Sequence, residues 1–103
     1  MDDRELLELA AKAVGVPVMG FSEDGAVERS DGGWWNPLDD VCECIEIAHD
    51  LGFEVIFTEQ GVNVCQIGEM VLLAAEPIAL YPHLSFMRAI VRAAAEIGKV
   101  ANE

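Results

Sequence analysis

Four carboxylates recur at intervals of four, three and four residues along one segment of the chain: Asp39, Glu43, Glu46 and Asp50. At this spacing they fall on one face of a helix, and no lysine or arginine lies between them. Like charges so placed cost a helix roughly 0.2–0.5 kcal/mol per pair. A row of carboxylates about one turn apart also imitates a row of phosphates. The pattern therefore predicts a surface for a basic partner protein, with a solvated helix face as the alternative.

Two adjacent tryptophans, Trp34 and Trp35, come shortly before these carboxylates. Neighbouring residues of an extended chain point to opposite sides, so we expect one of the two rings to be exposed. Tryptophan is enriched where protein interfaces concentrate their binding energy. We therefore predict that both tryptophans join the four carboxylates in a protein-binding surface. The alternative is that one ring packs inward and the other covers the edge of a sheet.

The cysteines and histidines show no pattern typical of catalysis or metal binding. Cys42 and Cys44 would lie about 200° apart on a helix, too far round to share a metal ion. Cys65 paired with His49 or His83 would be needed for a nucleophile or a metal site, and no local motif supports that reading. Small buried thiols are the simpler interpretation. We predict no catalytic, cofactor-binding or metal-ligating residue, and a protein that is not an enzyme.

The charge is strongly acidic and unevenly distributed. The chain has 19 acidic and 6 basic residues, a net charge of −13, and the interval from Ser30 to Met87 holds ten acids and no base. Such a field repels nucleic acids and anionic membranes, which bind through Lys and Arg. We therefore expect no direct binding to nucleic acid or membranes, and attraction to a basic protein; the alternative is that the charge serves only solubility.

The length and composition are those of one small domain. With 103 residues, 52% of them hydrophobic, the chain has room for a single core, so we predict one domain over residues 1–103. No apolar run approaches the roughly 18–20 residues that span a bilayer, and three cysteines cannot form a complete set of internal disulfides. Gly32-Gly33 is not followed by a phosphate-binding motif. We expect a cytoplasmic protein.

The first half of the chain predicts two helices and a hairpin. Apolar residues at helical spacing predict a helix over residues 3–14, which Gly15 ends. Residues 16–21 and 26–29 flank a turn at Asp24-Gly25 and read as a short hairpin. Asn36 and Pro37 favour the start of a second helix, which runs to Gly52. The apolar stripe predicted for this helix consists of Leu38, Val41, Ile45, Ala48 and Leu51.

The second half predicts three strands and a last helix. Residues 53–58 and 62–66 read as paired strands, and the unbroken apolar run 70–75 as a strand covered on both faces. Residues 77–82 read as a loop, Ser85 as the cap of a helix ending at Gly98, and the tail from Lys99 as frayed. We predict an α+β fold, mainly an antiparallel sheet of about five short strands with three helices on both faces, an α/β/α sandwich.

Three short motifs resemble the phage ABA sandwich domain family of small bacteriophage proteins. They are Ala13-Val14-Gly15, Trp35-Asn36-Pro37 and the run of residues 88–94, Arg-Ala-Ile-Val-Arg-Ala-Ala, and their order spans most of the chain. The resemblance implies a sheet sandwiched by helices and an origin in a phage or prophage. The family has no established activity, so it implies no catalytic residues.

Together these observations give one leading hypothesis and two alternatives. The leading one is a non-enzymatic, phage-encoded accessory protein in the host cytoplasm. It would bind and inhibit a basic host complex that handles nucleic acid or serves in defence, by phosphate mimicry in the manner of an anti-CRISPR inhibitor. The first alternative is a self-associating structural or regulatory module, a homodimer that uses Leu80, Tyr81 and Leu84. The second is a small Cys/His-dependent enzyme or metal protein.

Overall fold

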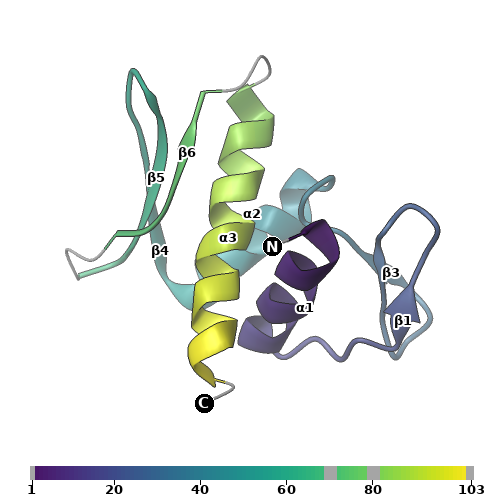
Figure 1. The fold of residues 1–103 in the computed structure, drawn as a ribbon. Helices are drawn as coiled ribbons and strands as arrows, with labels where there is room; N and C mark the ends of the chain where they lie inside the picture. The colour runs from purple at the N-terminus through teal and green to yellow at the C-terminus, as the bar shows by residue number, and fades with distance from the viewer. Residues whose placement is uncertain (1, 69–71, 79–81, 102–103) are drawn as a thin grey trace.

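The computed structural model describes residues 2–68, 72–78 and 82–101, and within them the chain is an α+β fold (Figure 1). The helices are α1 (Asp3–Val14), α2 (Val41–Leu51) and α3 (Pro82–Ala101). One sheet contains β1 (Gly20–Phe21), β2 (Val27–Glu28) and β3 (Trp34–Trp35), and the other contains β4 (Phe53–Phe57), β5 (Gly61–Gln66) and β6 (Leu72–Pro77). Both sheets are antiparallel and follow the chain order. No helix of the described residues is long and apolar enough to cross a membrane.

The prediction of about five strands in one sheet is wrong, since the structure has six described strands in two separate sheets. The β1–β2 hairpin forms around the predicted turn, with Phe21 opposite Val27, but each strand is only two residues long. Because β3 leads through a turn directly into α2, the chain leaves the first sheet before β4 begins.

Helix α1 forms as predicted, and both of its ends are capped. The Asp2 side chain accepts the backbone N–H of Glu5 at 2.9 Å, and Gly15 ends the helix with a φ of 78°. Its buried face consists of Leu6, Leu7, Ala10 and Ala11, and it packs along α3. The Arg4 guanidinium lies 4.6 Å from the ring centre of Phe21, a cation–π contact between α1 and β1.

Helix α3 is longer at both ends than the sequence predicts. It begins at Pro82, so Ser85 is not its cap; the Ser85 hydroxyl instead donates to the carbonyl of Pro77 at 2.8 Å and ties the helix to the end of β6. It also continues through Gly98 to Ala101. A Cβ at Gly98 would lie 1.9 Å from the carbonyl oxygen of Leu9, so this glycine permits close contact between α3 and α1 rather than ending the helix.

The three helices lie on the same side of the β4–β6 sheet in Figure 1. Alternate residues of the sheet, including Phe53, Val62, Val64 and Ala74, are buried on the side of α3, whereas Ile56 and Leu72 on the opposite face are 40% and 56% exposed. The predicted cover on both faces, and with it the sandwich of helices, is therefore wrong for the described residues. The predicted strand begins at Met70 and Val71, which lie outside them.

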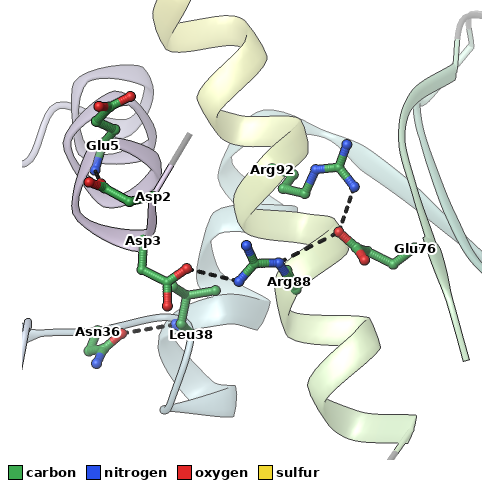
Figure 2. A network of polar contacts seen from close by, with 8 residues as sticks. All are labelled: Asp2, Asp3, Glu5, Asn36, Leu38, Glu76, Arg88 and Arg92. Carbon is green, nitrogen blue, oxygen red and sulfur yellow. Dashed lines mark hydrogen bonds and ion pairs between the residues drawn. The ribbon is translucent and has the colours of Figure 1, made fainter. Parts of the chain in front are cut away.

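A polar network joins α1, α3 and β6 (Figure 2). Arg88 of α3 bonds to Asp3 of α1 at 2.9 Å and lies 3.8 Å from the carboxylate of Glu76 on β6. Arg92, one turn further along α3, bonds to the same Glu76 carboxylate and to the carbonyl of Ala75. Two of the six basic residues of the chain are thus engaged in holding the elements together.

Candidate functional site: an acidic cleft beside α2

The structure brings three of the four predicted carboxylates to one cleft. Glu43, Glu46 and Asp50 of α2 line a cleft of about 310 Å³, which we call the acidic cleft. Trp35 also lines it, together with two short segments of chain, residues 14–17 at the end of α1 and residues 29–31 after β2. Asp39 and Trp34, the other two predicted site residues, are not among its lining residues.

Asp39 is separate from the others because α2 begins at Val41 and not at Pro37. The Asn36 carbonyl accepts the backbone N–H groups of Asp39 and Asp40, and the Asn36 side chain accepts that of Leu38, so residues 37–39 form a turn. Asp40 is the true N-cap, its side chain accepting the N–H groups of Cys42 and Glu43. The predicted row of four carboxylates on one helix therefore contains only three.

The orientation of α2 also differs from the predicted apolar stripe. Val41 and Ile45 are 45% and 54% exposed, whereas Cys44 and Ile47 are buried against the rest of the core. Helix rotation by 100° per residue then places Glu43, Glu46 and Asp50 together at the cleft. The far end of α2 is fixed by Gln66 of β5, whose side-chain amide donates to the carbonyls of Leu51 and Gly52.

Glu43 is partly a structural residue. Its carboxylate accepts the backbone N–H of Asn36 at 2.7 Å and so holds the turn against the first part of α2. Burial raises the pKa of Glu43, and the nearby carboxylates of Asp40 and Glu46 add to this, while the bond from Asn36 opposes it. The pattern Asp40-x-x-Glu43 is that of a capping box, a sequence signal that indicates the observed start of the helix.

The base that lines the cleft is already paired. Arg29 bonds to Asp31 at 3.0 Å, and the other oxygen of Asp31 accepts the backbone N–H of Gly33 at 2.8 Å. The hydrogen bond from Gly33, aided by Arg29, lowers the pKa of Asp31 and keeps this carboxylate ionised. The lining therefore carries four carboxylates and one guanidinium, a formal charge of −3. The carboxylates are those of Asp31, Glu43, Glu46 and Asp50, and the guanidinium is that of Arg29.

The two tryptophans separate as predicted, one inward and one outward. Trp35 is 4% exposed and belongs to the core, where it also forms part of the cleft wall. Trp34 is 54% exposed and lies opposite Glu28 on the neighbouring strand. The alternation of the two-residue strand β3 explains this difference, because successive side chains of a strand point to opposite faces.

The three cysteines occupy different environments. Cys44 is fully buried, its Sγ 3.8 Å from the carbonyl of Met87, and burial raises its pKa to about 12, so it is a neutral thiol at physiological pH. Cys42 is exposed and Cys65 is half-buried on β5. His49 is exposed on α2, 3.5 Å from the Asp50 carboxylate. No group of three or more His, Cys, Asp or Glu residues in the described part of the chain is placed to hold a metal ion.

Comparison with known proteins adds no family to this picture. No protein-family model matches the chain, and searches of curated proteins and of solved structures find no match either. The resemblance to phage ABA sandwich domains therefore stays a prediction. Any function has to be argued from the geometry and charge of the molecule itself.

Proposed function

We propose that this protein binds a basic partner protein at the acidic cleft and is not an enzyme. The observation that carries the proposal is the convergence of Glu43, Glu46 and Asp50 with Asp31 around a cleft whose one guanidinium is paired. A lysine or arginine side chain of a partner would meet uncompensated carboxylates there. The rest of the acidic field steers such a partner toward the site and raises its association rate.

The proposed partner is a host complex that handles nucleic acid or serves in defence, and the protein is a phage-encoded inhibitor acting in the host cytoplasm. Glu46 and Asp50, which we call the acidic row, are both exposed and lie about 6 Å apart along the helix axis at 1.5 Å per residue. Grooves that bind nucleic acid present Lys and Arg to successive phosphates. A row of carboxylates on a rigid helix occupies such a groove by the same charge pairing.

The test is capture from a bacterial lysate with matched charge variants. Glu46→Lys with Asp50→Lys reverses the acidic row and leaves the structural Glu43 in place. The control is Glu54→Lys with Glu59→Lys on β4 and the following turn; both residues are exposed and neither lines the cleft. Each substitution adds two charge units, so both double variants carry −9 instead of −13.

We expect the wild type and the control to recover a basic protein that high salt and added double-stranded DNA both release. The acidic-row variant should recover much less of it. Equal losses in both variants would mean that net charge, and not the cleft, drives binding. Retention in the presence of DNA would contradict phosphate mimicry while leaving a basic partner in place.

Self-association is a second candidate function, supported by an apolar group at one end of α3. Phe57, Ile78 and Leu84 are 64%, 52% and 43% exposed. Phe57 stacks on Phe86 of α3 at 5.8 Å, which brings the end of β4 beside the first turns of this helix. Leu80 and Tyr81, the other residues predicted for this contact, lie outside the described residues. Light scattering that shows a dimer for the wild type and a monomer for Phe57→Ser would support this function.

A further inference from the structure

We propose that the partner segment recognised by this protein is an amphipathic basic helix that lies along α2. Its apolar side chains would cover Val41 and Ile45, and its lysines or arginines would reach the acidic row. This inference rests on the proposed function and specifies which kind of basic segment the site selects.

The exposed half of α2 has two unlike edges. At 100° per residue, the exposed residues form three rows along the helix: Val41 with Ile45, then Cys42 with His49, then Glu46 with Asp50. The first row is apolar and the third row borders the acidic cleft. The centres of these two rows are about 140° apart around the helix axis. A partner helix placed over the middle row therefore meets apolar side chains on one flank and carboxylates on the other.

The apolar row does not face the core of the protein. Cys44 and Ile47 face the core, and Gln66 secures the end of the helix. Single exposed apolar residues are ordinary on protein surfaces. Val41 and Ile45 are instead neighbours one turn apart, and each is about half exposed on a regular helix. They form a small apolar stripe of the kind that an amphipathic helix covers.

Charge complementarity defines the partner. No lysine or arginine occurs between Ser30 and Met87, so the surface around α2 offers a partner's acidic residues no counter-charge from this interval. Long basic side chains lay their methylene stems along apolar surface while their charged ends reach carboxylates. Lys and Arg on one flank of a partner helix can therefore span from the middle row of α2 to Glu46 and Asp50. An acidic or uncharged amphipathic helix would lack this attraction.

The experiment uses a synthetic peptide of leucine and lysine arranged for an amphipathic helix, and a scrambled peptide of the same composition. Fluorescence anisotropy measures the affinity of each peptide for the full chain at several salt concentrations. The variants are Val41→Ser with Ile45→Ser, which removes the apolar row, and Glu46→Lys with Asp50→Lys, which reverses the acidic row. Urea unfolding of each variant verifies that it is folded.

We expect the wild type to bind the amphipathic peptide about tenfold more tightly than the scrambled one, a difference of about 1.4 kcal/mol. The apolar-row variant should lose most of this preference and keep the salt dependence. The acidic-row variant should bind both peptides weakly, with a reduced salt dependence.

Two results would contradict the amphipathic-helix partner and the binding at the acidic cleft separately. If the apolar-row variant keeps the full preference while the acidic-row variant binds weakly, the amphipathic-helix inference is wrong and the proposed function stands. If the acidic-row variant binds both peptides as tightly as the wild type, the proposed function itself fails.

Discussion

The contact between β5 and β6 at Gly61 allows a quantitative test of the sheet packing through Gly61→Ala. A Cβ at this buried position would lie 1.9 Å from the carbonyl oxygen of Glu76, and 3.0 Å from the Cα of Pro77. An ordinary contact begins at 3.4 Å, so the two strands would have to part by about 1.5 Å. The obstructing atoms belong to the backbone and cannot rotate away as a side chain does.

Neither strand is free to move. The Gly61 N–H donates to the Thr58 hydroxyl at 3.0 Å, and the Thr58 N–H donates to the Gly61 carbonyl at 2.8 Å. On the other strand, Arg92 binds the Glu76 carboxylate and Ser85 binds the Pro77 carbonyl. Parting the strands therefore strains or breaks bonds on both sides.

The expected cost is about 2 kcal/mol of unfolding free energy. Overpacking costs about 1–3 kcal/mol and a lost hydrogen bond about 1 kcal/mol. The lower entropy of the unfolded alanine chain offsets about 0.4–1 kcal/mol. For a domain of this size, such a loss lowers the melting temperature by about 8–16 °C.

Urea unfolding followed by circular dichroism and tryptophan fluorescence measures this loss. Gly20→Ala is the matched control, because its Cβ would meet only the flexible carboxylate of Glu28 at 3.4 Å. We expect this control to change the unfolding free energy by less than about 0.5 kcal/mol. If Gly61→Ala unfolds at the same urea concentration as the wild type and the control, the close contact between β5 and β6 does not constrain this position.

Two further predictions concern the site. In Trp34→Phe, the fluorescence of the remaining Trp35 should be blue-shifted and resist quenching by acrylamide, because Trp35 is buried. In Trp35→Phe, acrylamide should readily quench the fluorescence of the exposed Trp34. Equal quenching in the two variants would contradict this placement of the two rings. Burial raises the pKa of Glu43, so the fold loses stability as the pH rises through that pKa. Glu43→Gln removes the charge, so this variant should have a higher urea midpoint than the wild type at about pH 7. Near about pH 4 the wild-type carboxyl group is largely protonated, and the difference in urea midpoint should disappear. A higher midpoint for the variant at both pH values would contradict this prediction.

Local signals in the sequence predicted the elements better than their packing. Helix α1 has the expected bounds because its caps, Asp2 and Gly15, act on neighbouring backbone groups. The start of α2 was ambiguous because the sequence holds two competing signals. Asn36 and Pro37 favour one start, and Asp40 with Glu43 favours another. The second prevails because Asn36 uses its carbonyl and side chain to close a turn.

The buried side of α2 could not be predicted from spacing alone. A stripe through Val41 and Ile45 and a stripe through Cys44 and Ile47 both recur at helical intervals. The contact with α3 selects the second, with Cys44 beside the carbonyl of Met87. That choice leaves Val41 and Ile45 exposed on the outer face of α2.

The amino-acid sequence alone specifies the charge of the molecule, the lack of lysine and arginine between Ser30 and Met87, and the approximate segments that become helix or strand. These properties follow from composition and from interactions over a few residues. Contacts between distant segments determine that the strands form two sheets and that Trp34 rather than Trp35 is exposed. The tertiary structure also determines that Glu43 bonds to Asn36 while Glu46 and Asp50 are exposed. Burial is decided by contacts between segments far apart in the chain, and a local pattern does not specify which of two similar faces makes them.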